Sequence, residues 1–276
     1  MQTTESKNKA EILNGQILAD IIKVDLKKKI EKDFRRPGLA AILIGDDPAS
    51  DLYIKLKEKA SETVGIEFHK YICNQNCCSN ISEEEILQMI DFLNRDGSID
   101  AIIVQLPLPE YYNTQKIINA ISPDKDVDGF HPLNNKVTPP TIDSIIELLK
   151  ETKENLADKK TLIIGKSQIF IDGIEKYLKK NLGINSINAS EKIPENCQKY
   201  DIVIIALGQA YALKKESVKS GAIIIDVGIN KLDGKTVGDV DPCVMEVASY
   251  ISPVPGGVGP LTVACLLRNA YLLSLK

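Results

Sequence analysis

The sequence lacks the features that point to a membrane or a nucleic acid as partner. No stretch approaches the roughly 18 consecutive apolar residues of a transmembrane helix, and residues 1–15 are polar where a secretory signal would be apolar. The 34 Lys and Arg residues are outnumbered by 38 Asp and Glu, giving a net charge of -4. Clustered positive charge, which phosphate backbones require, is missing. We therefore expect no membrane and no nucleic acid as partner.

Histidine and paired cysteine are also scarce. The chain has two histidines and six cysteines, and the cysteine spacing fits neither a disulfide framework nor a zinc site. Cys73, Cys77 and Cys78 lie close together in sequence, but no zinc-ligand spacing includes them. We expect no metal and a reducing, cytoplasmic compartment.

What is present is the composition of a globular α/β protein. Of the 276 residues, 43% are hydrophobic and 26% are charged. Short aliphatic runs alternate with amphipathic segments, which predicts parallel strands covered by helices on both faces. The predicted strands are residues 39–44, 101–106, 161–165, 201–207 and 222–228, and the predicted helices are residues 49–64, 82–95, 140–151 and 172–181.

A domain boundary is expected within residues 134–142, where two adjacent prolines precede a helix cap. The predicted domains are residues 1–138 and 139–259. Residues 260–276 form a final apolar helix that could pack back on the first domain. Ligands of such sheets collect beyond the carboxyl ends of the strands or in a crevice between domains.

Two polar residues on the helix 49–64 could carry chemistry. Tyr53 and Lys57 are one turn apart and share a face, beside an apolar stripe expected to face the core, namely Leu52, Leu56, Ala60 and Val64. Lys55 and Lys59 should point to solvent. A lysine at the edge of a buried face can lose hydration and have its pKa lowered, which suits proton transfer. The alternative is a surface lysine beside a half-buried tyrosine.

Three further polar positions follow apolar segments. Gln105 ends the strand 101–106 and is placed to bind a ligand or, equally, to satisfy loop backbone. Asp126 and Asp128 precede Gly129, which suggests either a calcium loop, whose full pattern is missing, or a capped turn.

Two glycine-containing loops complete the candidates. The segment GKSQIFIDG (165–173) stands where a nucleotide phosphate meets a helix N-terminus, yet it lacks the G-x-G-x-x-G pattern. The segment PVPGGVGP (253–260) is both stiff and sterically open. Such a loop can bring backbone N–H groups against a planar or anionic ligand, although a plain connector is the alternative.

Six segments, taken in their order along the chain, resemble the bifunctional methylenetetrahydrofolate dehydrogenase/cyclohydrolase family. They are YIKLK (53–57), VQLPLP, PDKDVDGFHPLN, GAIIIDVGIN, VGDVD and PVPGGVGP. The resemblance spans roughly residues 10–275. It implies a Rossmann-like C-terminal domain, a cleft between the domains, and two steps. NADP oxidises 5,10-methylenetetrahydrofolate to the methenyl cation, and water converts that cation to 10-formyltetrahydrofolate. It also implies a homodimer and a role in one-carbon metabolism and purine biosynthesis.

The resemblance also assigns residues to roles. Lys57 matches the family's catalytic lysine, and Tyr53 matches the tyrosine that is its partner. Gln105 matches the glutamine that hydrogen-bonds to the lysine and tunes it, and Asp128 matches the aspartate that holds the pterin. The remaining matches are Pro255, Gly256 and Gly257 for the folate pocket, and Gly165, Lys166, Ser167, Ser190, Thr138 and Ile229 for the cofactor.

The sequence departs from the family where NADP should bind. The family shows G-R-S-x-x-V-G-x-P; here Lys166 replaces arginine, Ile171 replaces glycine and Gly173 replaces proline. The lysine keeps the positive charge but loses the bidentate fork that suits a 2′-phosphate. The isoleucine is expected to place a branched side chain where the pyrophosphate should approach. The usual Cys-His-Ser string aligns with residues 188–190, keeping only the serine, and the loop 134–138 is short. Three functions therefore stay open: the bifunctional enzyme with NADP or NAD, mainly a cyclohydrolase with weak dinucleotide binding, or a non-catalytic folate-binding protein.

Overall fold

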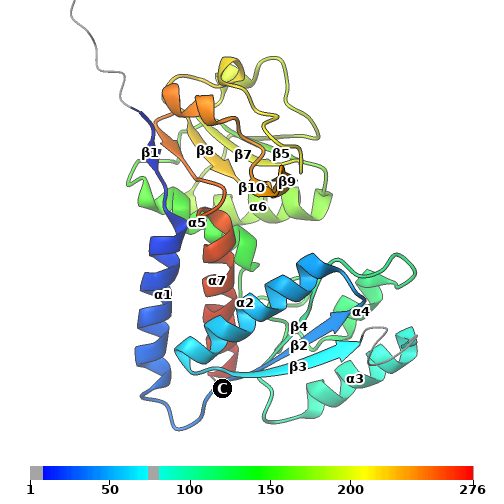
Figure 1. Cartoon of the computed structure of the whole chain (residues 1–276). Helices are drawn as coiled ribbons and strands as arrows, with labels where there is room; N and C mark the ends of the chain where they lie inside the picture. The colour runs from blue at the N-terminus through cyan, green and yellow to red at the C-terminus, as the bar shows by residue number, and fades with distance from the viewer. Residues whose placement is uncertain (1–8, 74–80, 276) are drawn as a thin grey trace, which may run out of the picture. The chain divides into compact units, whose positions relative to one another are not determined.

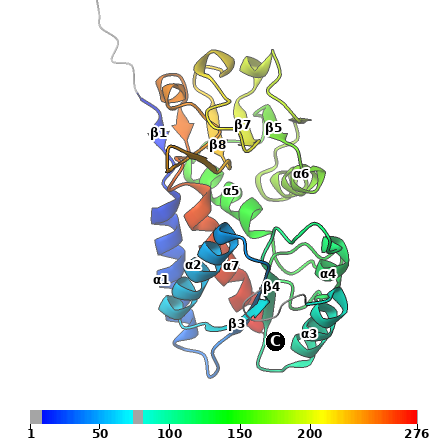
Figure 2. The same cartoon turned by 45° about the vertical axis from the view of Figure 1, so that its right-hand side comes forward.

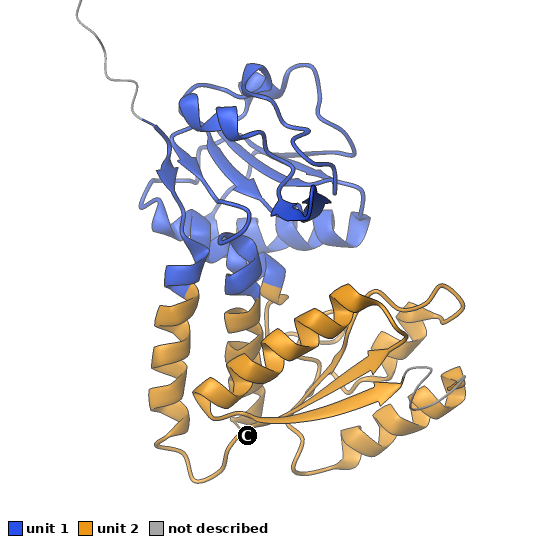
Figure 3. Ribbon diagram, viewed as in Figure 1, with its two compact units in different colours: residues 1–18, 141–262 blue, residues 19–140, 263–276 orange. Residues whose placement is uncertain are grey.

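The computed structural model describes residues 9–73 and 81–275. The chain divides into two compact units. Unit 1 comprises residues 1–18 and 141–262, and unit 2 comprises residues 19–140 and 263–276 (Figure 3). Each unit is built on a parallel sheet, so the predicted architecture of two α/β domains is confirmed.

Unit 2 contains a three-stranded parallel sheet in the order β3-β2-β4 (Figure 1). Its strands are β2 (Gly38–Ile44), β3 (Glu67–Cys73) and β4 (Ala101–Val104), and its helices α2 (Pro48–Val64), α3 (Glu83–Arg95) and α4 (Thr114–Ala120). Successive residues of β2 point to opposite faces and supply two different apolar clusters: Leu39, Ala41 and Leu43 join one, and Ala40, Ile42 and Ile44 join the other. This double burial explains the unbroken apolar run.

Helices cover both faces of this sheet. The first cluster is completed by residues of α1 (Gly15–Ile30), of α2 and of α7 (Val258–Ser274), and the second by residues of α3 and α4 (Figure 2). Leu266, Leu267, Ala270 and Leu273 of α7 are the C-terminal contribution to the first cluster. The last helix therefore packs on the sheet of unit 2.

Unit 1 contains a six-stranded, wholly parallel sheet in the order β1-β11-β8-β7-β5-β6. Its strands are β1 (Glu11–Ile12), β5 (Thr161–Gly165), β6 (Ile187–Ser190), β7 (Ile202–Ala206), β8 (Ile223–Asp226) and β11 (Tyr250–Ile251). Unit 1 also contains a hairpin of β9 (Asn230–Leu232) and β10 (Lys235–Val237) and the helices α5 (Pro140–Glu151) and α6 (Gln168–Leu182). Three short 3-10 helices lie at Cys197–Lys199, Lys215–Ser217 and Pro242–Glu246.

The strand order in this sheet reverses beside β5. After β5 the chain adds β6 on one side, then crosses to add β7 and β8 on the other. In open parallel sheets, such a reversal leaves a crevice at the carboxyl ends of the strands, where dinucleotides bind. The topology thus directs attention to the residues that follow β5, β7 and β8.

The division of the chain differs from the predicted domain limits at the N-terminus. The sequence assigned residues 1–138 to one domain, whereas residues 1–18 group with residues 141–262. The physical reason is β1, which pairs in parallel with β11 at the edge of the unit 1 sheet.

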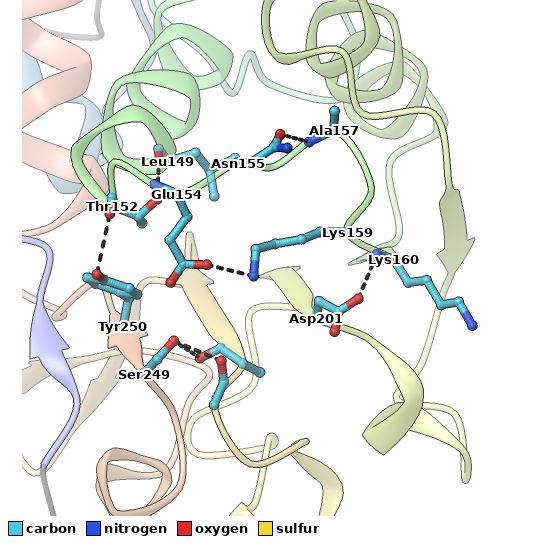
Figure 4. Close-up of polar contacts among 12 residues, drawn as sticks. Leu149, Thr152, Glu154, Asn155, Ala157, Lys159, Lys160, Asp201, Ser249 and Tyr250 are labelled. Atoms are coloured by element: carbon cyan, nitrogen blue, oxygen red, sulfur yellow. Dashed lines mark hydrogen bonds and ion pairs between the residues drawn. The ribbon is translucent and has the colours of Figure 1, made fainter.

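Polar contacts fasten the connection from α5 to β5 (Figure 4). The Tyr250 hydroxyl donates to the Thr152 carbonyl oxygen at 3.3 Å, and Lys159 pairs with Glu154 at 2.6 Å. The backbone N–H of Lys160 donates to the Asp201 carboxylate at 2.8 Å. These contacts lie at the amino-terminal edge of the sheet, because Lys160 precedes β5 and Asp201 precedes β7.

Candidate functional site

Lys57 lies on the buried face of α2. The helix begins after Asp47, whose carboxylate accepts the N–H groups of Ala49 and Ser50, and it ends at Gly65 in a left-handed conformation. The fully or nearly buried residues within the helix are Ser50, Ile54, Lys57, Ser61 and Val64. Lys57 is 8% exposed, so its ammonium group is largely removed from water.

The predicted orientation of this helix is partly wrong. Leu52 and Leu56 were expected to face the core, but they are 55% and 48% exposed. The buried stripe instead runs through Ile54, Lys57 and Val64. A lysine can occupy it because its amino group finds acceptors inside the protein, a condition that apolar periodicity does not reveal. Lys55 and Lys59 are exposed, as predicted.

Gln105 supplies the main acceptor. The Nζ of Lys57 donates to the Oε1 of Gln105 at 2.8 Å. The Nε2 of Gln105 donates to the carbonyl oxygen of Leu106 at 2.7 Å, and its backbone N–H donates to Ile42 of β2. The glutamine is therefore fixed at both ends, and its position just after β4 orients the lysine. The bond to Leu106 is the loop-backbone contact, one of the two alternatives raised for Gln105; binding of a ligand stays a prediction.

Asp128 provides the opposite charge. Desolvation lowers the pKa of Lys57, and the charge of Asp128 opposes that change. Asp128 is itself partly enclosed, and desolvation raises its pKa to about 6 even though Lys57 acts in the other direction. Tyr53 is half-buried one turn before Lys57, and desolvation raises its pKa. Lys57, Gln105 and Asp128 are thus brought together from three segments of unit 2.

Asp126 has a structural task. Its carboxylate accepts the backbone N–H of His131 at 2.8 Å and the side-chain amide of Asn134 at 3.0 Å. Gly129, at φ +68°, makes the turn between them. This is the capped turn, one of the two alternatives for the acidic pair, and it leaves Asp128 to interact with Lys57. In the two described ranges no group of three His, Cys, Asp or Glu could hold a metal ion; Cys77 and Cys78 lie outside those ranges.

The PVPGG loop in unit 1 has a shape that only glycine permits. Gly256 has φ +107°, and a side chain on Gly257 would meet the carbonyl oxygen of Pro253 at 2.6 Å. The start of α1 also passes close by, since a side chain on Gly15 would meet the Gly257 carbonyl oxygen at 1.9 Å. Pro255 is exposed. The helix α7 starts at Val258, directly after the loop.

The dinucleotide candidates of unit 1 lie along one edge of the sheet. Gly165 ends β5, Lys166 is exposed beside it, and the Ser167 hydroxyl caps α6 by accepting the N–H of Phe170. Ser190 ends β6, and its hydroxyl donates to the Lys192 carbonyl oxygen. Ile229 follows β8 and is 51% exposed. Thr138 belongs to unit 2, where its carbonyl oxygen accepts from Asn269.

The side chain of Ile171, in the substituted loop, is buried. This residue is 4% exposed and therefore points into the core, so the expectation that its branched side chain stands where a pyrophosphate would approach is wrong. Gly173 lies where α6 passes α5, since a side chain there would meet Ile142 at 2.7 Å. Gly165 has the Phe170 ring beside it. The helix N-terminus with the adjacent Lys166 thus fits an anionic group.

Sequence reasoning missed two buried acids in this unit. Asp226 is 3% exposed and Asp239 is fully buried. They stand in the strings DVG and GDV, which contribute to the family resemblance but carry no predicted role of their own. An aspartate beside a glycine at the end of an apolar strand was the available signal.

Together, these features define a two-unit α/β enzyme with a buried lysine–glutamine pair in one unit and a dinucleotide-binding sheet in the other. The catalytic-domain family described as tetrahydrofolate dehydrogenase/cyclohydrolase matches residues 13–128, and its NAD(P)-binding-domain family matches residues 139–275. The chain belongs to the tetrahydrofolate dehydrogenase/cyclohydrolase family.

Relatives extend this match over the whole chain. The bifunctional protein FolD of Streptococcus pyogenes serotype M5 is 41% identical, over 96% of this chain and 98% of that protein. The crystal structure of FolD from Campylobacter jejuni is 37% identical with a TM-score of 0.90, covering 96% and 98% of the two chains. FolD from Trypanosoma brucei, solved with NADP and an inhibitor, is 28% identical with a TM-score of 0.87, covering 96% and 97%.

Proposed function

We propose that this chain oxidises 5,10-methylenetetrahydrofolate with NADP and hydrolyses the resulting methenyl cation to 10-formyltetrahydrofolate. The observation that carries the proposal is the hydrogen bond from Lys57 to Gln105 beside the charge of Asp128. A buried lysine with a lowered pKa can exchange a proton near neutral pH, which an exposed lysine does poorly.

Each folate-side residue has a distinct proposed task. Lys57 moves the proton during hydrolysis, and Gln105 holds the Nζ in one orientation. Asp128 keeps enough negative charge nearby to prevent the lysine pKa from falling further, and it binds the amino and ring nitrogens of the pterin. Tyr53 packs against the pterin-derived ring from the same face of α2. Pro255, Gly256 and Gly257 shape the pocket.

Unit 1 is proposed to hold the dinucleotide. The positive end of α6, with the Ser167 cap, would receive the pyrophosphate, and Lys166 and Ser190 would meet the 2′-phosphate. Ile229 is a further proposed cofactor-binding residue of this unit, and Thr138, in unit 2, is also proposed to bind the cofactor. When bound, NADP accepts a hydride; the task of the protein is to align the two rings.

The bifunctional enzyme is favoured over a chain that acts mainly as a cyclohydrolase. One sequence argument for weak NADP binding is the replacement of a glycine by Ile171, and that side chain is buried in the core. The retained Lys57, Gln105 and Asp128 cluster argues against a non-catalytic folate-binding protein.

Assembly and physiological setting are proposed from the same resemblance. We propose a cytoplasmic homodimer that supplies 10-formyltetrahydrofolate for purine biosynthesis. Among the described residues, Cys73, Cys197, Cys243 and Cys265 are not joined in disulfides, which suits a reducing compartment. No helix in residues 9–73 or 81–275 is both long and apolar enough to cross a membrane. Sedimentation equilibrium of the purified chain tests the dimer, and a monomer would contradict it.

The activity is tested by absorbance with purified protein. With 5,10-methylenetetrahydrofolate and NADP, we expect the nicotinamide band to grow and the methenyl band to rise and then decay. Decay of added methenyltetrahydrofolate without any cofactor reduction would favour the cyclohydrolase alternative. Folate binding with neither reaction would overturn the proposal.

A further inference from the structure

The two buried acids of unit 1 are linked by a hydrogen bond. Asp226 ends β8 and accepts the backbone N–H groups of Gly228 at 2.9 Å, Asp239 at 3.1 Å and Val240 at 2.9 Å. Asp239 therefore donates its own N–H to the other acid. Seven donors in all converge on these two carboxylates, three on Asp226 and four on Asp239.

The four donors to Asp239 come from two separate loops. Three are the successive backbone N–H groups of Leu207, Gly208 and Gln209, at 2.6, 3.0 and 2.7 Å, which follow β7. The fourth is the side-chain amide of Asn230, at 2.9 Å, which follows β8. One carboxylate thus ties together the loops at the carboxyl ends of two neighbouring strands.

Glycines make room for both carboxylates. A Cβ on Gly228 would lie 2.2 Å from the Cγ of Asp239, and a Cβ on Gly238 would lie 1.9 Å from an oxygen of Asp226. Asp239 therefore packs against Gly228, which lies two residues after Asp226. Asp226 packs against Gly238, which directly precedes Asp239. Both strings, DVG and GDV, need their glycine, because a side chain on either glycine would displace a carboxylate.

The tied loops border the place where a dinucleotide should lie. Ile229 is 51% exposed, while the residues on either side of it, Gly228 and Asn230, are both held by the acids. Gly208, in the other loop, has φ +66° and open space where a side chain would point. The carboxyl edge of β7 and β8 thus presents one exposed apolar side chain on a firmly held backbone.

We propose that Asp239 is a positioning residue for dinucleotide binding. It holds the loops after β7 and β8 in register and so fixes Ile229 without touching the cofactor. This inference rests on the proposed function, in which the cofactor lies at that edge. A charged acceptor is suited to the task because hydrogen bonds to ionised groups are stronger than those between neutral ones.

The test is the Asp239→Asn variant of the full chain. Asparagine keeps the shape but replaces an accepting oxygen by an amino group that faces N–H donors. We expect the dissociation constant of NADPH, from nicotinamide fluorescence, and the KM for NADP to rise about tenfold, the equivalent of one lost charged hydrogen bond. The cyclohydrolase kcat and the KM for methenyltetrahydrofolate, measured without dinucleotide, should stay within about twofold of wild type.

Asp201→Asn is the matched control. The Asp201 carboxylate also accepts two hydrogen bonds, one from the backbone N–H of Lys160 and one from the Nζ of Lys219. Asp201 precedes β7, however, and so lies at the opposite edge of the sheet (Figure 4). It should lower thermal stability without changing NADPH binding. If Asp239→Asn does not fold, Asn230→Ala removes a single donor and should raise the NADP KM several-fold.

The outcomes separate the two proposals. If wild type binds NADPH and Asp239→Asn (or Asn230→Ala in its place) binds it equally well, the positioning role is wrong and the proposed function stands. A loss of NADPH binding in Asp201→Asn equal to that in Asp239→Asn would also overturn the role, because general destabilisation would explain both. If wild type shows no dinucleotide binding, the proposed function itself fails, and the positioning role with it.

Discussion

The Nζ of Lys57 lies 2.8 Å from the Oε1 of Gln105, and both side chains are less than 10% exposed. The two residues come from α2 and from the end of β4, 48 positions apart in sequence. An amino group in this setting has one fixed acceptor and one nearby acid, Asp128. A buried amino group that is held in one orientation beside an acid is suited to proton transfer.

Replacing Lys57 by methionine should abolish most of the hydrolysis. Methionine fills similar volume but cannot carry a proton, and general acid–base groups contribute about 100- to 10,000-fold to rate. We expect the cyclohydrolase rate of Lys57→Met to fall by at least about 100-fold, as measured by decay of the methenyl band. Folding should be preserved, because the change relieves burial of a charge.

The control is Lys59→Met on the same helix. Lys59 is exposed, so this variant loses the same charge without touching the buried pair and should keep nearly full activity. A Lys57→Met enzyme with near-full hydrolysis would remove the lysine from the mechanism.

Asp128→Asn should shift the pH dependence of hydrolysis. The charge of Asp128 raises the pKa of Lys57, opposing desolvation; without that charge the pKa of Lys57 should fall further. We therefore expect the limb of the cyclohydrolase pH–rate profile that reports Lys57 to move to lower pH. A profile whose limb stays in place would show that the two groups do not interact.

The same variant should alter how stability depends on pH. The folded-state pKa of Asp128 is raised to about 6, so the folded protein holds this proton more tightly than the unfolded chain does. Its contribution to stability is present at about pH 4 and is lost as the pH rises through 6. Relative to wild type, Asp128→Asn should therefore gain about 2 kcal/mol in free energy of unfolding between pH 4 and pH 7.5. Urea unfolding at both pH values measures this, and a constant difference would contradict it.

The sequence predicted the sheets better than the side-chain environments. Strand 39–44 was recognisable because both of its faces are buried, which leaves an unbroken apolar run. The rotation of α2 was not, because the acceptor that allows Lys57 to be buried stands 48 residues away. Motif resemblance identified Gln105 and Asp128, but only the folded chain shows that Asp126 caps the turn.

The loop after β5 shows the same limit. The resemblance aligns Ile171 with a glycine, which predicts that the side chain obstructs a pyrophosphate. The residue lies within α6, on its core face. Which face of a helix a residue occupies depends on where the helix starts, and the Ser167 cap sets that start.

Ile171→Ala should therefore weaken folding and leave cofactor binding unchanged. Truncating a buried isoleucine typically costs about 2–5 kcal/mol through the cavity it leaves. We expect a loss of that size in the free energy of unfolding by urea, with an unaltered KM for NADP. Ile169→Ala, two residues earlier and 68% exposed, should change stability by less than about 0.5 kcal/mol. Tighter NADP binding by Ile171→Ala would mean that the side chain does obstruct the site.

Lys166 should decide how strongly the enzyme prefers NADP to NAD. It is an exposed cation directly after β5, and the 2′-phosphate is the only chemical difference between the two dinucleotides. Lys166→Ala should lower the ratio of kcat/KM for NADP to that for NAD by about tenfold, the equivalent of one charged contact. Lys166→Arg should raise the ratio, because a guanidinium binds phosphate through two parallel hydrogen bonds.

The matched variant for this comparison is Lys179→Ala. Lys179 lies in the last turn of α6, paired with Glu175 at 2.5 Å, so its loss changes the net charge of unit 1 equally. Initial rates with each dinucleotide, at one fixed ionic strength, give the ratio for all three variants. If Lys179→Ala lowers the ratio as far as Lys166→Ala does, the preference reflects the overall charge of the unit. If only Lys166→Ala lowers it, a direct contact with the 2′-phosphate accounts for the preference.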